Sequence, residues 1–411
     1  MMTASPSMEN STVTRAGILV RTLDQGLWSL GFFVFNVTAG VSLTVGEFAS
    51  LSVGAALGFI AVGTSRAWGI YAPIVDAARI GISPEDSIDR WSSWRGTLFF
   101  ATVVGVASFA WTSHGGDWGY AAAVGALAAT MVISDLPRQV LIIRGSYSHA
   151  ALLAGLYAVG ALLAAGTIAL GVDNSALLPI WFCTLLIVLA AGLVFCGTAT
   201  STSKSDSHFA IAWRITAEAV YLGFGSQIAT LLLYLIQDDT ATAGIRFAYS
   251  LVFAPAFVII QSIQPLIFKQ FATLSAQGTR AVLAVSVRWN FAVALGLGAC
   301  GVVGYTALST LFSDIGPAAA LPYVVPVGMA ILSAQTFEVA LMATRFFVGP
   351  VFTHRARLAS VLVDVGSQTI GVFVGGAAGL VWTLIVLSGL RIAVAVAMLV
   401  VLPRRDRTET T

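Results

Sequence analysis

The sequence predicts an all-helical integral membrane protein with about twelve transmembrane helices. The 411-residue chain is 57% hydrophobic and 10% charged, with a mean hydropathy of +0.89, whereas soluble domains carry about 25% charged residues. Its apolar residues gather in runs of about 20, the length that crosses the hydrocarbon core of a bilayer as a helix. Short polar loops of alternating charge separate these runs. Length, composition and loop charge therefore predict the same class.

The apolar runs define twelve predicted spans. In order, they cover residues 22–42, 46–65, 97–113, 119–137, 149–170, 176–197, 213–236, 244–264, 289–312, 320–344, 357–377 and 380–402. The longest loop, between Arg66 and Arg95, contains the acidic segment SPEDSID, and we predict an interfacial helix or elbow there.

A polar segment, GTATSTSKSDSH from Gly197, divides the spans into six and six and is typical of a linker. Each half also holds a similar phrase, GEFASLSV from Gly46 and GIRFAYSL from Gly244. We therefore predict two lobes, a plan that is common in membrane proteins with internal repeats. The predicted domains are a tail over 1–21, an N-lobe over 22–197, a linker over 198–212, a C-lobe over 213–402 and a tail over 403–411.

Loop charge predicts the orientation. Arginine and lysine precede the first span and follow the even-numbered spans, and the intervening gaps are acidic. The acidic gaps hold Glu47, Asp117, Asp173, Asp238, Asp239 and Asp314. Because positive loops stay on the cytoplasmic side, both termini are predicted to be cytoplasmic, in the inner (plasma) membrane of a bacterium. Among the basic residues, Arg246 alone lies near an acidic gap.

Several functional classes are disfavoured. A nucleic-acid-binding protein needs a basic soluble face, and the sequence offers none. Neither lysine belongs to a GxxxxGK[ST] loop, so ATP hydrolysis is not expected. The three cysteines lie inside apolar runs and the four histidines lie on separate loops. We therefore expect no enzyme, no cofactor, no metal site and no disulfide framework.

Three segments carry a family resemblance. The opening RTLDQGLWSLGFFVFNVTAGVSLTVGEF, from Arg21, continues to an arginine that closes the second span. DLPRQVLIIRGSYSHAALLAGLYAVG follows from Asp135, and GIRFAYSLVFAPAFVIIQSIQPLIFKQF from Gly244. These segments resemble the first two helices, the fourth-to-fifth helix junction and the eighth helix of polysaccharide and O-antigen flippase-like proteins. Those proteins belong to the multidrug/oligosaccharidyl-lipid/polysaccharide (MOP) exporter superfamily.

The resemblance implies a MOP/MATE-like fold, with two six-helix lobes that face each other across a central cavity. It implies transport of a polyprenyl-linked saccharide for lipopolysaccharide, O-antigen or another cell-surface polysaccharide, by lobes that rock between inward-open and outward-open states. The expected partners are this lipid-linked substrate, membrane lipids, and the glycosyltransferases or polymerase of the same pathway.

Two alternatives remain open. The first is a cation-coupled multidrug exporter of the same fold, which relies on acids buried in the N-lobe. Asp24 and Asp135 are the candidates for that role. The second is a membrane partner that scaffolds a polysaccharide synthase and transports nothing.

Ionisable residues inside predicted spans are candidates for a site, because each costs about 2.5–3.5 kcal/mol to insert into a bilayer. Candidates for lining the cavity and contacting an anionic head group are Asp24, Arg66, Arg246 and Arg391. Candidates for ion pairing or for coupling are Glu218, Glu338 and Asp364.

Each candidate also has a purely structural interpretation. Arg66 lies at an inner helix end, where arginine anchors to head groups, and Asp24 lies in a first helical turn, where a carboxylate favours the helix dipole. Glu338 and Asp364 are suited to pairing with arginines across helices. For Arg391, near the middle of the last span, the structural alternative is a buried ion pair.

Overall fold

The computed structural model describes residues 15–74, 90–196, 208–252, 279–311, 319–348 and 350–405. These residues are helical apart from turns and contain no strand, which confirms the predicted all-helical class. The long helices are α1 (Arg15–Ser42), α2 (Val45–Arg66), α4 (Arg90–Thr112), α5 (Trp118–Ile143), α6 (Tyr147–Ala169), α7 (Leu177–Cys196), α8 (His208–Leu235), α10 (Thr279–Leu311), α11 (Leu321–Val348) and α12 (Pro350–Arg405). Short segments η1 (Ala67–Tyr71), η2 (Ser113–Gly115) and η3 (Asn174–Ala176) adjoin them, and a further helix covers 239–252.

Every predicted span overlaps a described helix, but several helices are longer than predicted. Helix α1 begins at Arg15 rather than at 22, and α10 begins at Thr279 rather than at 289. Helix α5 continues through Pro137 to Ile143, although its span was predicted to end at 137. Apolar runs mark only the part of a helix that lies in hydrocarbon, and helices extend beyond it.

Two predicted segments fall partly outside the described residues. The predicted linker, 198–212, is described only from His208, where α8 already begins. In the predicted elbow between Arg66 and Arg95, the helix that begins as α2 continues through η1 to Ile74, and α4 begins at Arg90. Residues 75–89 lie outside the description.

Seven helical stretches of the described residues are long and apolar enough to cross a membrane. One of them, Phe352–Val401, has 50 residues, or about 75 Å of helix at 1.5 Å per residue, against about 30 Å of hydrocarbon. Gly376 interrupts α12 with φ 58° and ψ −141°, a backbone conformation that suits glycine. It lies where the spans 357–377 and 380–402 were predicted to meet.

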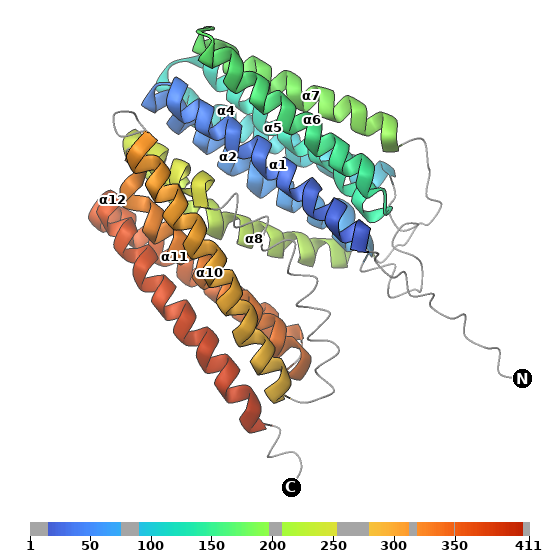
Figure 1. Cartoon of the computed structure of the whole chain (residues 1–411), viewed down its shortest axis with the longest axis vertical. Coiled ribbons are helices and arrows are strands. Elements are labelled where there is room, and N and C mark those ends of the chain that lie inside the picture. The colour runs from blue at the N-terminus through green and yellow to red at the C-terminus, as the bar shows by residue number, and fades with distance from the viewer. Residues whose placement is uncertain are drawn as a thin grey trace, which may run out of the picture.

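The helices form two groups (Figure 1). In the first group α1 packs on α6, and α5 packs on α2, α4 and α7; in the second, α11 packs on α10 and α12. Helix α8 lies between them and contacts both α2 and α12. In Figure 1 the second group diverges from the first toward the end of the molecule that carries both termini.

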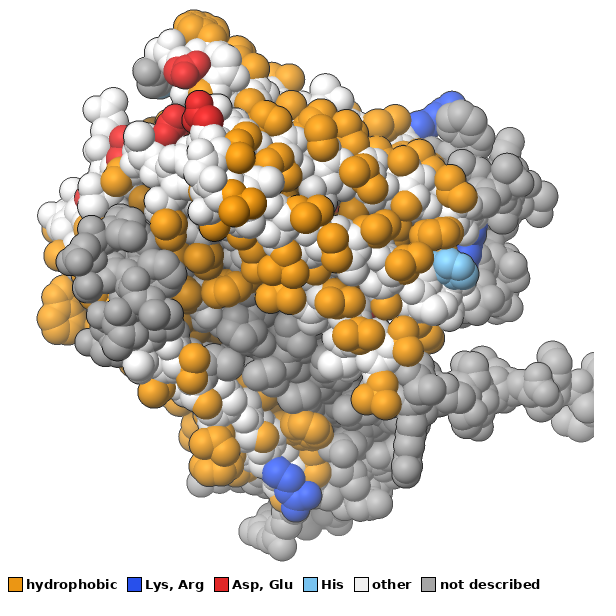
Figure 2. Space-filling model, turned by 45° about the horizontal axis from the view of Figure 1, so that its top comes forward, with side chains coloured by type: hydrophobic (Ala, Val, Ile, Leu, Met, Phe, Trp, Pro, Cys, Tyr) orange, Lys and Arg blue, Asp and Glu red, His pale blue; other side chains and the backbone are white. Residues whose placement is uncertain are grey.

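The surface carries an apolar band between charged ends. In Figure 2 orange side chains cover the middle of the molecule, acids gather at one end, and arginines with a histidine lie at the other. Large apolar side chains such as Leu163, Val194 and Val374 are between 62% and 84% exposed. An aqueous protein rarely presents such an area. Together with the seven apolar stretches, this surface is that of a multi-pass membrane protein.

The acids of the predicted outer side have a local role as helix caps. Thr44 and Glu47 form a reciprocal capping box at the start of α2. Asp117 accepts a 2.9 Å bond from the Tyr120 amide at the start of α5, and Asp238 does the same for the Ala241 amide before the helix 239–252. Helices that begin at this side need N-terminal acceptors, so capping adds a second reason for the acidic gaps.

Candidate functional site

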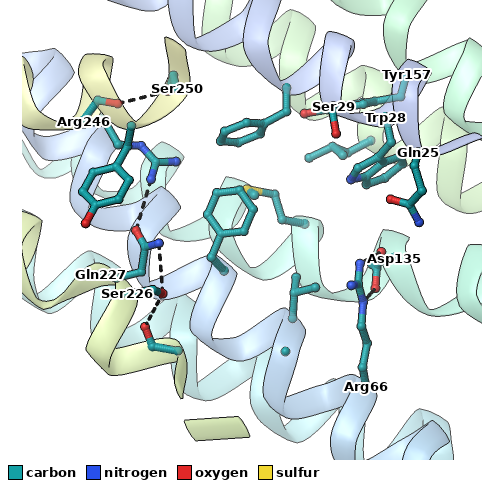
Figure 3. Close-up of a pocket in the computed structure, with 18 residues that line it drawn as sticks. Gln25, Trp28, Ser29, Arg66, Asp135, Tyr157, Ser226, Gln227, Arg246 and Ser250 are labelled. Atoms are coloured by element: carbon teal, nitrogen blue, oxygen red, sulfur yellow. Dashed lines mark hydrogen bonds and ion pairs between the residues drawn. The ribbon is translucent and has the colours of Figure 1, made fainter. Parts of the chain in front are cut away.

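A cavity of about 240 Å³ lies between the first helix group, α8 and the helix 239–252. We call it the first cavity. Residues that line it include Gln25, Trp28, Ser29, Phe32, Phe59, Val62, Gly63, Arg66, Met131, Asp135, Tyr157, Leu185, Gly223, Ser226, Gln227, Arg246, Tyr249 and Ser250. Figure 3 shows Arg246 and Gln227 on one side and Arg66 with Asp135 on the opposite side. Two guanidinium groups therefore lie on opposite sides of a space whose lining includes five aromatic residues, Trp28, Phe32, Phe59, Tyr157 and Tyr249.

One wall of the first cavity rests on a rigid aromatic stack. The rings of Phe35 and Trp181 lie parallel at 4.6 Å, and the Trp181 indole donates a 3.1 Å bond to the Tyr157 hydroxyl. Trp28 stacks on Tyr157 with ring centroids 4.5 Å apart. Because α1, α6 and α7 each contribute to this stack, the Trp28 face of the cavity is held in place.

Arg246 is buried without a carboxylate partner among the described residues. Arg246 is only 3% exposed. Nη1 donates a 3.2 Å bond to Gln227 Oε1, and the guanidinium carbon lies 5.3 and 5.2 Å from the ring centroids of Phe32 and Phe59. These rings offer cation–π attraction. Nε and Nη2 are buried and find no acceptor in the described part of the chain.

The arrangement leaves two N–H donors of a buried cation free for a ligand. An unsatisfied buried donor costs about 1–3 kcal/mol, and more when it is charged. Such a group calls for an explanation, and a bound ligand, ion or ordered water supplies one. The chemistry that fits Nε and Nη2 of one arginine is a carboxylate or a phosphate, which accepts two parallel bonds.

The opposite wall carries an ion-pair chain of two arginines and two aspartates. Arg66 donates from Nε and Nη2 to Asp135 at 2.6 and 2.7 Å. Arg138 donates in the same way to Asp24 at 2.8 and 2.7 Å, and its Nη1 lies 3.6 Å from Asp135. Arg138 also lies over the Trp28 ring, 4.6 Å from its centroid. Within this chain of four, charge is balanced.

A second cavity of about 470 Å³ lies between α8, the helix 239–252, α11 and α12. It is lined by two ion pairs, Arg391 with Asp364 and Arg357 with Glu338. Arg357 also contacts Glu218, whose carboxylate lies 3.7 Å from His354. Ser226 and Tyr249 line both cavities, so the two cavities are neighbours.

The helix 239–252 and α8 meet the first group near the acidic end of the molecule. The rings of Phe48 and Phe247 lie 6.3 Å apart, and Ser50 shares a 3.1 Å hydrogen bond with Tyr234. Phe247 also packs on Gly40, where a Cβ atom would lie 2.6 Å from the ring. Phe48 is the third residue of GEFASLSV and Phe247 is the fourth of GIRFAYSL, so each similar phrase contributes one ring to this contact.

The structure places the predicted candidates differently from one another. Arg66 and Arg246 line the first cavity, and Arg391 lines the second. Asp24 is fully buried against Arg138 and is not among the lining residues of either cavity. Its pairing, rather than the helix dipole, accounts for its position.

The three predicted pairing or coupling acids all contact arginines. Glu218 and Glu338 share Arg357, and Asp364 contacts Arg391. The structure therefore contains the ion pairs that the structural interpretations of Glu338, Asp364 and Arg391 described. Glu338, Asp364 and Arg391 also line the second cavity.

Sequence reasoning missed the residues that complete the site. Arg138 was counted among the loop charges after the fourth span, yet its side chain is completely buried in α5. Its spacing of three from Asp135, within a continuing apolar pattern, was the available signal. The cage residues Phe32, Phe59 and Gln227 carried no such signal. The described residues contain no group of three histidines, cysteines or acids suited to a metal ion.

A search against protein families finds no match for this chain, and no curated protein matches it. Solved structures do match. An inward-facing multidrug resistance MATE family transporter of the MOP superfamily superposes with a TM-score of 0.63 at 13% identity, over 94% of this chain and 96% of that one. The chain has the MATE-type fold.

Two further solved structures share this fold. An outward-facing multidrug resistance MATE family transporter gives a TM-score of 0.52 at 14% identity, over 94% and 96% of the two chains. A MOP superfamily transporter from Pyrococcus furiosus, described as having a binding pocket of reverse polarity, gives 0.51 at 12% identity, again over 94% and 96%.

Proposed function

We propose that this chain is a membrane transporter that moves an anionic, polyprenyl-linked saccharide across the plasma membrane by alternating access. Its termini are cytoplasmic, and its cargo is a precursor of cell-surface polysaccharide made by glycosyltransferases of the same pathway. The observation that carries the proposal is Arg246, a buried arginine that lines the first cavity and has two nitrogens without an acceptor among the described residues.

The chemistry of the first cavity suits a diphosphate. Each charge-assisted hydrogen bond to a phosphate oxygen contributes about 1.5–3 kcal/mol, which offsets part of the hydration that the head group loses. On the facing wall, the Arg66 side chain is 22% exposed, but its two bonds to Asp135 balance its charge, so Arg246 supplies the uncompensated positive charge among the described lining residues. The exposed apolar surface of α1 and α8, including Leu23 and Trp213, keeps a prenyl tail in lipid.

A multidrug exporter of cationic drugs shares the fold but fits the cavity charge less well. Such an exporter needs a carboxylate that can bind a cation or a proton. The N-lobe candidates, Asp24 and Asp135, are each held by two bonds from an arginine. The Pyrococcus furiosus transporter, described as having a binding pocket of reverse polarity, is a precedent for a change of pocket charge on this fold.

A scaffold that transports nothing is disfavoured by the same residue. A scaffold gains nothing from a buried cation without a counter-charge, because replacing it with an apolar side chain removes the desolvation cost. The Arg246 donors in the first cavity favour a ligand instead.

The proposal is tested by reconstituting the chain in liposomes and following the movement of a fluorescent saccharide linked to polyprenyl diphosphate. Arg246→Ala should slow movement by about one to two decades, the value of one charge-assisted bond. Arg288→Ala is the matched control, since Arg288 is an exposed arginine of α10, and it should move the cargo normally. Unchanged transport by Arg246→Ala, or movement of cationic drugs alone, would reject the proposal.

A further inference from the structure

The second cavity adjoins the first but differs in its chemistry. Four charged residues line it as two ion pairs, Arg357 with Glu338 and Arg391 with Asp364. The charges of these four residues balance, and Glu218, which also contacts Arg357, adds a carboxylate beside them, so this cavity has no excess positive charge for an anion. It offers guanidinium donors and carboxylate acceptors side by side. Two glutamines that also line it, Gln335 and Gln368, add amide donors and acceptors.

Gln368 has the clearest indication of a missing partner. The residue is 4% exposed, and its Oε1 is buried with no hydrogen-bond donor in the described part of the chain. A buried acceptor without a donor is costly. Because Gln368 lines the cavity, a ligand hydroxyl there would supply the donor.

The ligand that matches both donors and acceptors is a sugar. A hydroxyl group donates one hydrogen bond and accepts up to two, so a hexose uses paired guanidinium and carboxylate groups together. The volume of about 470 Å³ lies within the range of about 300–1,000 Å³ that suits drug-sized ligands. The space fits the first sugars of a saccharide, and Ser226 and Tyr249 connect it to the cavity of Arg246.

We infer that the second cavity is the glycan subsite of the transported lipid-linked saccharide, with Gln368 as a specificity-determining residue. The inference rests on the proposed function: the diphosphate lies against Arg246 in the first cavity and the sugar extends past Tyr249 into the second. Gln368 Oε1 accepts a hydrogen bond from one sugar hydroxyl. A site built to bond a hydroxyl discriminates against a sugar that lacks it, because its polar group is then left unpaired.

The test compares ligands with and without a sugar on the purified full chain. Farnesyl diphosphate is the sugar-free probe, and farnesyl diphosphate linked to glucose, galactose or N-acetylglucosamine forms the glycosylated panel. The wild-type chain should bind at least one glycosylated probe more tightly than farnesyl diphosphate. Gln368→Leu should weaken that probe about three- to tenfold, the value of one neutral hydrogen bond, and leave farnesyl diphosphate unchanged.

Two controls separate a binding role from a structural one. Thr369→Val changes the next residue, which bonds the Val365 carbonyl at 2.7 Å and lines neither cavity, and it should leave all affinities unchanged. Gln368→Leu should melt no lower than wild type, because it removes an unpartnered acceptor. If Gln368→Leu does not insert, Gln368→Met, which keeps the length but lacks the acceptor, takes its place.

The outcomes distinguish this inference from the proposed function. If no glycosylated probe binds more tightly than farnesyl diphosphate, or if Gln368→Leu weakens both ligand types equally, the glycan subsite is wrong. If Arg246→Ala leaves farnesyl diphosphate binding unchanged, the proposed function is wrong, whatever Gln368 does.

Discussion

Arg138 and Arg246 are both buried arginines near one cavity, yet their surroundings are opposite. Arg138 makes two short bonds to Asp24, lies near Asp135 and covers the Trp28 ring. Arg246 has one amide oxygen and two aromatic rings around it, and two of its nitrogens have no partner among the described residues. The charge of the buried Arg138 is thus balanced by nearby carboxylates, whereas the charge of the buried Arg246 has no carboxylate partner among the described residues.

The difference separates structure from function. An arginine held by two carboxylate bonds ties α5 to α1, and its charge is balanced within the protein, although its Nη1 is buried without a hydrogen bond in the described part of the chain. An arginine without a counter-charge contributes little to folding and is suited to an external anion. Variants of the Arg138 pair should therefore mainly change the free energy of unfolding, whereas variants of Arg246 should mainly change the affinity for an anionic ligand.

The largest effect is expected from Asp24→Ala. It leaves the Arg138 guanidinium buried with only Asp135 at 3.6 Å, and breaking one side of a buried pair costs about 3–5 kcal/mol. The free energy of unfolding in detergent, from a denaturant titration, measures it. Replacing both partners, Asp24→Leu with Arg138→Met, should recover most of the loss. A single variant as stable as wild type would remove the structural role of this pair.

Asp135→Asn should lower the free energy of unfolding by less than Asp24→Ala does, and it should tighten the binding of an anionic ligand. Asp135 accepts two bonds from Arg66, and hydrogen bonds to charged groups contribute about 1.5–3 kcal/mol. Arg66 is partly exposed to the cavity, so its released guanidinium stays solvated and adds positive charge there. Calorimetric titration with farnesyl diphosphate should show tighter binding than wild type. Weaker binding would mean that Asp135 holds Arg66 in its binding position.

Much of the fold, and part of the site, follows from the sequence. Apolar runs locate the helices, because hydrocarbon demands about 20 apolar residues whatever the tertiary contacts. They do not locate helix ends such as Arg15 or Thr279, which are not apolar. Its position beside an acidic gap identified Arg246 as unusual. It could not identify Phe32, Phe59 or Gln227, because their approach to Arg246 depends on how α1, α2 and α8 pack.

The distinction between paired and unpaired arginines was beyond sequence reasoning for the same reason. Asp24 and Arg138 are 114 residues apart, and no local pattern relates them. Asp364 and Arg391 both lie within α12, on either side of Gly376. The break at Gly376 reverses the chain, and the pair can only be seen once that turn is known.

Gly40→Ala tests whether the contact between the groups supports the cavity of Arg246. A Cβ atom there would lie 2.6 Å from two atoms of the Phe247 ring, and overpacking costs about 1–3 kcal/mol. Gly26→Ala on the same helix has no atom within 4 Å of its new Cβ and should be neutral or slightly stabilising. Equal melting temperatures for the two variants, in a thermal scan, would show that Phe247 has room to move.

The central claim is tested most directly by measuring stability and anion binding together on Arg246→Leu. The free energy of unfolding should change by less than about 1 kcal/mol or rise, because the variant removes a buried charge that has no counter-charge. The affinity for farnesyl diphosphate should fall by about one to two decades. Arg246→Lys should recover only part of it, because an ammonium cannot donate two parallel bonds. A variant that loses several kcal/mol of stability, as expected for Asp24→Ala, or that binds the diphosphate with full affinity, would contradict the account.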